Sequence, residues 1–232
     1  AEGYAWWTAR IARALHSADV IRIDHFRGFA GYYEIPMSSP DAKQGRWLPG
    51  PGKPLFDAIE KALGSLPIVA EDLGFITEDV TTLRDSCGFP GMKILQFAFG
   101  GDAGQAYLPH TYPRRCVAYT GTHDNNTSCG WWQQTSARER SFAGSYLACG
   151  THDVHWAMIR SACNSVADWA MFPLQDVLGL PSEQRMNTPG TLGPQNWTWR
   201  FEWPQITPEA TRVLGLISAA SGRGPFGLLH LG

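Results

Sequence analysis

The chain has 232 residues, which is enough for one large domain with its own buried core. Hydrophobic residues make up 44% and charged residues 17%, as in an ordinary globular protein rather than a disordered one. The formal net charge is -2 and the basic residues form no stripe, so nucleic acid is not an expected partner. No apolar run is long enough to span a membrane, and a membrane is not an expected partner either.

The cysteines are odd in number and scattered without a CxxC pair, which favours reduced thiols over a disulfide framework and makes a poor zinc set. They are Cys87, Cys116, Cys129, Cys149 and Cys163. A cytoplasmic location is therefore expected, with a plastid stroma as the alternative. The chain begins at Ala1 rather than Met, which we interpret as a fragment or a processed chain.

The first half of the chain alternates helical patterns with short apolar runs. In chain order, we predict a helix over 4–17, a strand over 20–24, a helix over 53–63, a strand over 67–70, a helix from Thr77 to before Gly88, and a strand over 92–97. The acidic residues after Thr77 suit the start of a helix, and the glycines between elements mark turns.

The second half continues the alternation. We predict a strand over 116–120, a helix from the capping box Ser136–Glu139 to near Gly150, a helix capped by Thr151 and running to about Cys163, a strand over 169–172, a loop over 181–206, and a last helix over 208–220. Most of the ten Trp residues are expected in the core, because Trp buries a large apolar area.

This order of elements predicts an α/β fold with a parallel sheet. A complete (β/α)8 TIM barrel needs eight strands over about 250 residues, whereas this chain offers five convincing strands. We therefore expect the C-terminal part of a TIM barrel, about five βα units, incomplete at the N-terminus. Residues 1–223 would form this partial catalytic domain, and 224–232 a frayed or atypical C-terminal tail.

Three apolar segments end in a carboxylate: Asp24, Glu71 and Asp124. Carboxylates are costly to bury, and barrel enzymes carry their catalytic groups at the C-terminal ends of strands. Cleavage of a glycosidic bond with retention needs two carboxyl groups about 5–5.5 Å apart. The alternative is a structural role, in which Asp24 pairs with Arg22 or Arg27 and Glu71 caps the following turn.

The segments around these acids, 22–29, 70–74 and 121–125, resemble those of the 4-α-glucanotransferase family (amylomaltases or disproportionating enzymes). Further segments agree in the family's order: 3–7, 45–52, 90–99, 175–179, 185–190 and 196–200. The resemblance covers about residues 3–220.

The resemblance implies that Asp24 is the nucleophile, Glu71 the acid/base and Asp124 a third carboxylate that favours the oxocarbenium-like transition state. It also implies that Arg22 and His123 lie in the same pocket and that Asn187 approaches the substrate on a loop. Trp47, flanked by Gly and Pro, is placed for sugar contact, whereas the pair Trp131–Trp132 is expected to pack in the core.

The reaction implied by the resemblance moves an α-1,4-glucan segment from a donor to an acceptor. The expected partners are maltooligosaccharides, starch- or glycogen-derived α-glucans, and glucose as an acceptor. No cofactor or metal is implied, because side chains meet both carboxyl roles.

Several alternatives stay open. One is a retaining α-glucan hydrolase, and another is a metal-dependent hydrolase that uses His25 beside Asp24 and His123 beside Asp124. A third is an inactive or glucan-binding fragment, whose open edge at residues 20–24 would make the isolated chain poorly soluble.

Two further signals are weak. His152 and His155 are spaced for a metal on a helix but are expected on its surface, and the thiols have no obvious base partner.

Overall fold

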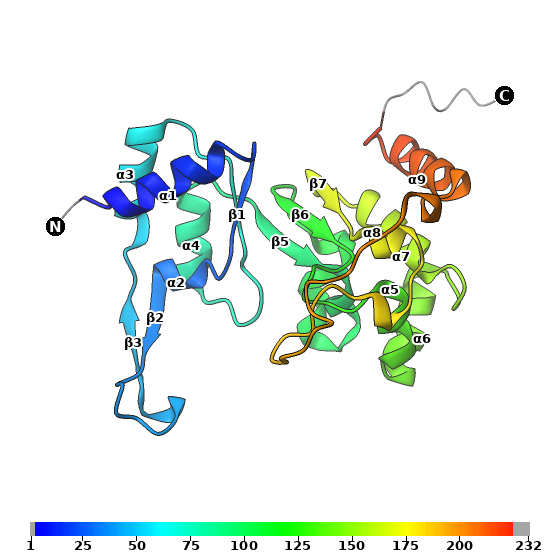
Figure 1. Ribbon diagram of the computed structural model, residues 1–232, viewed down its shortest axis with the longest axis horizontal. Coiled ribbons are helices and arrows are strands. Elements are labelled where there is room, and N and C mark those ends of the chain that lie inside the picture. Colours follow the sequence, from blue (N-terminus) through cyan, green and yellow to red (C-terminus); the bar gives the residue numbers. More distant parts are fainter. Residues whose placement is uncertain (1–2, 225–232) are drawn as a thin grey trace. The chain divides into compact units, whose positions relative to one another are not determined.

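Short strands and helices alternate along the computed structural model, which describes residues 3–224 except the side chains of residues 102 and 103 (Figure 1). The chain forms two compact units, with the division between Met92 and Lys93. Both contain helices and strands, so the predicted mixed α/β class is confirmed.

Unit 1 consists, in chain order, of α1 Ala5–Leu15, β1 Ile21–Ile23, α2 Arg27–Ala30, β2 Gly31–Glu34, a 3-10 turn Ala42–Gln44, β3 Arg46–Pro49, α3 Gly52–Leu63, β4 Ile68–Ala70, α4 Glu78–Ser86 and the start of β5 Gly91–Ile94. Strands β1 and β4 pair in parallel with Ile23 opposite Ala70. Apolar side chains from the helices and both strands form one core around Phe26 and Ile59, which are fully buried.

The hairpin of β2 and β3 was not predicted. The two strands pair antiparallel with Tyr33 opposite Trp47, and the hairpin extends from the helical part of unit 1 (Figure 1). Neither strand has a fully buried residue, so the sequence lacks the apolar alternation by which strands are recognised. The ring contact between Tyr33 and Trp47 and the ion pair between Arg46 and Glu34 hold the register instead.

Unit 2 contains the rest of β5, the 3-10 segments Leu95–Phe99, Asp102–Tyr107 and Pro109–Thr111, then β6 Cys116–Tyr119, α5 Ser128–Gln134, α6 Ala137–Leu147, α7 Val154–Cys163, β7 Trp169–Met171, α8 Leu174–Val177, the 3-10 turns Ser182–Gln184 and Trp203–Gln205, and α9 Pro208–Ala220. Its sheet has the order β5-β6-β7, and β6 and β7 are parallel. Helix α7 is central to the packing, because its buried face contributes Met158 to one core cluster and Ile159 to another.

All five predicted strands and all six predicted helices are present, although their ends differ. Strand β5 stops at Ile94 rather than at residue 97, because Leu95–Phe99 turns into a 3-10 helix. The capping box of Ser136 and Glu139 is confirmed at the start of α6. The one-turn helices α2 and α8 and the short α5 were not predicted.

Two expectations were wrong. Thr151 does not cap α7, which begins at Val154; the Thr151 hydroxyl accepts a hydrogen bond from Trp132 Nε1 (3.1 Å) instead. Most Trp residues do not lie in the core either: of the ten, only Trp132 is buried, and five are exposed. The expected packing of Trp131 and Trp132 is confirmed, because both belong to one hydrophobic cluster.

The predicted tail lies, except for Gly224, outside the described residues. None of the helices in the described part of the chain combines the length and the apolar composition that a membrane crossing requires.

Candidate active site

Two of the three predicted acids follow neighbouring strands of unit 1. Ile23 pairs with Ala70 in the parallel register, so Asp24 and Glu71 are the next residues of β1 and β4 at the same edge. The Glu71 amide donates to the Ile23 carbonyl (2.9 Å), and the Glu71 carbonyl accepts from the Phe26 amide (3.0 Å). Neighbouring strands are about 4.8 Å apart, which brings both acids within reach of one small group.

Asp24 is the open member of this pair. Its side chain is 74% exposed, and its carboxylate accepts a hydrogen bond from Arg22 Nη2 at 2.6 Å. The Arg22 guanidinium is less exposed, at 29%, and also contacts the Met92 sulfur through Nε (3.3 Å). Arg22 is thus held between the core and Asp24, as the structural alternative of an Arg22 pair and the family resemblance both predict.

Glu71 is held by backbone amides. Its Oε2 accepts from the His25 amide (2.6 Å) and its Oε1 from the Leu73 amide (2.9 Å). The Leu73 bond is the turn cap predicted from the sequence, and the His25 bond ties Glu71 to the residue after Asp24. His25 has φ 49°, a left-handed conformation that is uncommon for a residue with a side chain. Such strained residues concentrate at functional sites, because the surrounding structure must hold them.

Asp72, the residue after Glu71, is buried at 8% exposure. Its carboxylate accepts from the Met92 amide (2.7 Å) and pairs with Arg84 of α4. Adjacent acids therefore differ in role: Asp72 joins β4, α4 and β5, whereas Glu71 lies beside Asp24.

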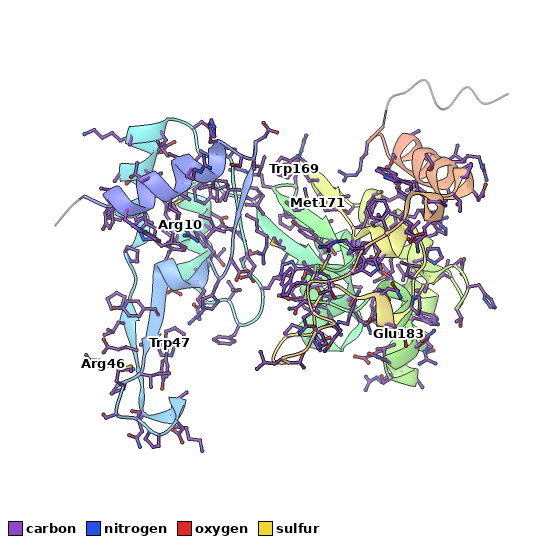
Figure 2. The ribbon with its side chains drawn as sticks, in the orientation of Figure 1. Arg10, Arg46, Trp47, Trp169, Met171 and Glu183 are labelled. Atoms are coloured by element: carbon purple, nitrogen blue, oxygen red, sulfur yellow. The ribbon has the colours of Figure 1, made fainter. Side chains whose placement is uncertain are left out.

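Trp47 lies on the hairpin and is 56% exposed (Figure 2). The Arg27 guanidinium stacks over its ring, 4.4 Å from the centroid. Arg27 in turn donates to the Phe75 carbonyl (3.1 Å) and to the Thr77 hydroxyl (3.2 Å). The predicted alternative that Arg27 pairs with Asp24 is therefore wrong. Trp47 is partly exposed with a cation over its ring, and stays a predicted sugar contact.

Asp124 belongs to unit 2, on a segment that we call the Asp124 loop, residues 121–127, between β6 and α5. Asn187 Nδ2 donates to Asp124 Oδ1 (2.7 Å), and Arg185 Nη2 donates to the Asp124 carbonyl (2.8 Å). Burial lowers the pKa of Arg185, and the negative charge of the neighbouring Asp124 partly offsets this decrease. The structure thus brings together Asp124 and Asn187, two predicted site residues separated by 63 positions.

His123 and Trp197 complete this group. His123 Nε2 lies 3.3 Å from Asp124 Oδ2, and the His123 ring lies 5.1 Å from the Trp197 ring. Trp197 has a left-handed backbone (φ 63°), and its amide donates to the Met186 carbonyl (2.8 Å). Neither Arg185 nor Trp197 was predicted as a site residue, although both lie in segments that resemble the family.

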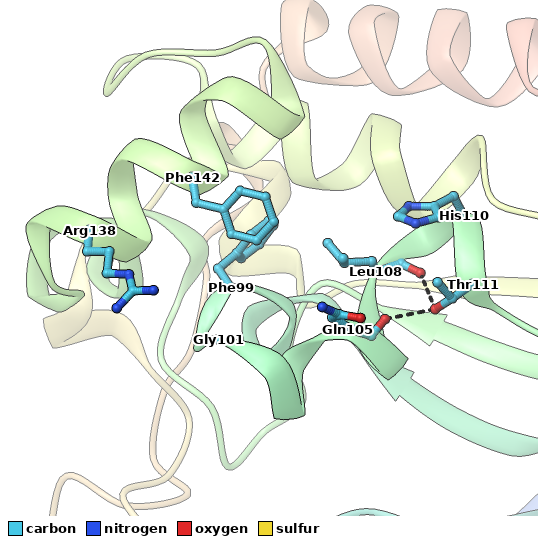
Figure 3. Close-up of a pocket in the computed structure, with 8 residues that line it drawn as sticks. All are labelled: Phe99, Gly101, Gln105, Leu108, His110, Thr111, Arg138 and Phe142. Atoms are coloured by element: carbon cyan, nitrogen blue, oxygen red, sulfur yellow. Dashed lines mark hydrogen bonds between the residues drawn. The ribbon is translucent and has the colours of Figure 1, made fainter.

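A separate cavity of about 480 Å³ lies in unit 2 between α6 and the three 3-10 segments that follow β5 (Figure 3). Phe99, Leu108 and Phe142 give it an apolar wall, and His110 and Arg138 line it with polar groups. None of the predicted site residues lines this cavity.

Two minor expectations need correction. His155 is partly buried rather than on the helix surface, and its Nδ1 lies 3.7 Å from the Cys129 sulfur, so that this thiol does have a base nearby. Burial nevertheless raises the pKa of Cys129 to about 11, which keeps the thiol protonated and a poor nucleophile.

His152 precedes α7 rather than lying on it. In the part of the chain that the structure describes, no three His, Cys, Asp or Glu side chains could hold a metal.

A family model described as 4-alpha-glucanotransferase matches residues 1–207. The chain belongs to the 4-α-glucanotransferase family. It is 48% identical over 226 residues to the 4-alpha-glucanotransferase of Synechocystis sp., covering 96% of this chain and 45% of that protein. It is 45% identical over 230 residues to that of Thermus thermophilus (96% and 46%), and 51% identical over 202 residues to the chloroplastic/amyloplastic form of Solanum tuberosum (86% and 35%).

The fold agrees with this family. The chain matches the amylomaltase of Streptococcus agalactiae, solved in complex with acarbose, with a TM-score of 0.91 and 36% identity, covering 96% of this chain and 45% of that one. An amylomaltase from Corynebacterium glutamicum matches with a TM-score of 0.68 at 19% identity, over 84% of this chain and 34% of that one, and supports the fold alone. The chain spans less than half the length of these 4-α-glucanotransferases.

Proposed function

We propose that the chain carries the catalytic carboxylates of a 4-α-glucanotransferase, which moves an α-1,4-glucan segment from a donor to an acceptor glucan. Asp24 attacks the anomeric carbon and forms a covalent glycosyl-enzyme, while Glu71 protonates the leaving oxygen. Glu71 then removes the proton from the acceptor hydroxyl, which displaces Asp24 and restores the α configuration. Asp124 contacts the sugar hydroxyls and favours the oxocarbenium-like transition state.

One observation carries this proposal: the parallel register of β1 and β4, which makes Asp24 and Glu71 neighbours at one strand edge. The strand spacing of about 4.8 Å is compatible with the separation of about 5–5.5 Å that a retaining mechanism requires. The His25 amide on Glu71 fixes this pair further, and Arg22 offers a positive charge beside the proposed nucleophile.

We assign the remaining predicted site residues to substrate binding. Arg22, His123 and Asn187 offer hydrogen-bond donors for sugar hydroxyls, and Trp47 offers a ring face for stacking. The expected ligands are maltooligosaccharides, starch- or glycogen-derived α-glucans, and glucose as an acceptor. The acarbose in the Streptococcus agalactiae amylomaltase makes acarbose a suitable probe of this site.

The fold proposal is that β1, β4, β5, β6 and β7 are five successive strands of a (β/α)8 barrel, within a partial catalytic domain over residues 1–223. The parallel pairs β1-β4 and β6-β7, and the sheet order β5-β6-β7, support this. In unit 1, the Ala70 amide donates to the carbonyl of Pro90, the residue before β5 (2.9 Å), as expected if β5 follows β4 in the barrel.

The proposed function is tested with maltotriose. The chain should convert it to glucose and longer maltooligosaccharides, as followed by mass spectrometry, and Asp24→Asn should abolish this conversion. Asp19→Asn, the same change in an exposed acid before β1, serves as the matched control and should remain active. Glucose and maltose alone would indicate a hydrolase instead, and no reaction by the folded chain would refute the activity proposed for it.

A further inference from the structure

The Asp124 loop is joined at both ends to one buried carboxylate, that of Asp176 in α8. Thr120, the residue before the loop, donates its hydroxyl to Asp176 Oδ2 at 2.6 Å. Ser128, the residue after the loop, donates its amide to Asp176 Oδ1 at 2.6 Å. The two partners are 56 and 48 positions away in the sequence. One side chain therefore bridges Thr120, the residue after β6, and Ser128, the first residue of α5.

The environment of this bridge is dry. Asp176 is 1% exposed, and Thr120 and Ser128 have no exposed surface. Burial raises the pKa of Asp176, and the hydrogen bonds from Ser128 and Thr120 oppose that rise. A buried carboxylate is expensive, and charge-assisted hydrogen bonds are among the strongest that a protein makes. A connection made only for stability could use apolar side chains, as the neighbouring clusters of unit 2 do.

A second buried polar side chain holds the same loop. Gln96, at 7% exposure, donates from Nε2 to the Asn126 carbonyl at 2.7 Å, and its backbone amide donates to the Thr120 carbonyl at 3.4 Å. The side-chain amide of Gln96 lies so close to Gly121 that a larger residue at position 121 would clash with it. Within the loop, Asn125 Oδ1 accepts from both the amide and the hydroxyl of Thr122 (2.9 Å each). The loop therefore has a fixed shape as well as fixed ends.

The chain segment after α8 carries the two residues that contact Asp124 directly. Arg185 and Asn187 follow Asp176 by nine and eleven positions and donate to the carbonyl and the carboxylate of Asp124. The bridge thus connects the loop that carries Asp124 to the start of the segment that carries its hydrogen-bond donors. A shift of α8 would move both sides of this contact.

We propose that Asp176 is a positioning residue, whose buried carboxylate bridges the two ends of the Asp124 loop and thereby fixes Asp124 against Asn187 for glucan transfer. The inference rests on the proposed function of Asp124. Asp176 does not contact substrate in this proposal. It acts through the geometry of Asp124, where a displacement of about 1 Å can lower a rate by about 10²-fold.

The test compares Asp176→Ala, Thr120→Val and a core control, Met158→Ala, in the full chain with maltotriose as substrate. Met158 is buried in α7, where its side chain belongs to a hydrophobic cluster. Asp176→Ala should lower kcat by about 10²-fold with a smaller change in KM. The reason is that Asp124 would be displaced from the position in which it contacts the transition state. Thr120→Val keeps the side-chain shape and leaves the hydrogen bond from Ser128 to Asp176 in place. It should therefore lower kcat by less than Asp176→Ala does.

Met158→Ala should lower the melting temperature without a comparable loss of kcat. Asp176→Asn serves as the conservative variant, since its amide oxygen can still accept from Ser128 and its NH₂ can donate to the Thr120 oxygen; it should recover part of the kcat that Asp176→Ala loses. An unchanged kcat in folded Asp176→Ala, or losses of kcat that simply follow melting temperature across all variants, would overturn the proposal. If Asp176→Ala does not fold, Thr120→Val and Asp176→Asn decide the question.

Hydrogen exchange separates this proposal from the proposed function. Amides of residues 121–127 should exchange faster in Thr120→Val and Asp176→Asn than in the unaltered chain, while those of α7 should not change. This readout needs no activity. If the chain without substitutions shows no glucan transfer, the proposed function is refuted. If the exchange rates of the loop amides are the same in Thr120→Val and Asp176→Asn as in that chain, the bridge is refuted independently.

Discussion

The strained backbone of His25 gives the proposed site a property that depends on conformation rather than on side-chain chemistry. At φ 49° the amide of His25 points to Glu71 Oε2, 2.6 Å away. A side chain at this φ costs on the order of 1–3 kcal/mol, which glycine avoids. The geometry of the Asp24 and Glu71 pair therefore depends on a conformation that the neighbouring strands impose.

This strain predicts different outcomes for two substitutions that both remove the imidazole. His25→Gly should keep the left-handed backbone and the amide bond to Glu71. His25→Val places a β-branched side chain where φ is positive, so we expect it to lower the free energy of unfolding by about 1–3 kcal/mol relative to His25→Gly and to lower kcat further. Urea unfolding and the maltotriose assay measure both quantities. Equal stability and equal kcat in the two variants would contradict the prediction.

For individual residues, the sequence predicted the acids at strand ends but not the distant residues that they contact. Asp24 and Glu71 were recognisable because each directly follows an apolar run. The Asp176 bridge and the Arg185 contact join residues separated by 48 to 61 positions. No local periodicity reports such pairs, because they depend on how the loops pack after the strands have formed.

Among the elements, α6 is the one whose start the sequence determined most fully. The Ser136 hydroxyl accepts from the Glu139 amide, and the Glu139 carboxylate accepts from the Ser136 amide (3.1 Å). These bonds satisfy amides that have no partner within the helix. Hydrogen bonds from Thr135 and Ser136 lower the pKa of Glu139, so this part of the cap is present above the ordinary Glu range and is lost as pH falls below it.

We predict that Ser136→Ala lowers the free energy of unfolding by about 1 kcal/mol. Ser145→Ala, in the exposed interior of the same helix, is the matched control and should be neutral or slightly stabilising, because alanine has the higher helix propensity. Chemical denaturation at pH 7 measures both. A loss in Ser145→Ala as large as that in Ser136→Ala would show that the cap is not responsible.

Elements with buried faces were predictable, and elements exposed on both faces were not. Strand β4 is buried at every position, and its apolar run Ile68–Ala70 is visible in the sequence. The hairpin of β2 and β3 has no fully buried position, and its stability comes from the backbone ladder and a few side-chain pairs. The one-turn helices α2 and α8 are too short to show a period.

The contact between α7 and α5 contains a group that should make stability depend on pH. Burial lowers the pKa of His155 below its ordinary value of 6.5, with the Asp153 charge opposing the shift. Well above that value His155 is neutral in both states. As pH falls below it, the unfolded chain binds the proton more readily than the folded protein, so the free energy of unfolding decreases.

The window from about pH 7.5 to about pH 5 spans the ordinary His range. Across it, we expect the free energy of unfolding to decrease more in the unaltered protein than in His155→Gln. His152→Gln, an exposed position before α7, is the control and should follow the unaltered protein. Urea titrations across this window provide the measurement. Parallel pH curves for His155→Gln and the unaltered chain would rule out His155 as the source.

For the whole molecule, the relevant feature is the open edge of β1. Among the described residues, β1 pairs only with β4, and its other side has no strand partner. An unpaired strand edge offers amide and carbonyl groups to another chain, which natural proteins usually prevent by covering the edge or placing charges on it. Val20, just before β1, is 36% exposed and carries no charge.

We predict that the isolated 232-residue chain self-associates and that Val20→Lys shifts it toward monomer, because a lysine at a strand edge opposes pairing. Val166→Lys makes the same change of charge at an exposed position in unit 2, 62% exposed, and should have little effect. Size-exclusion chromatography with light scattering measures the populations at several protein concentrations. A monomeric unaltered chain with one sharp melting transition would refute the edge argument, and an equal effect of both lysines would assign the change to net charge instead.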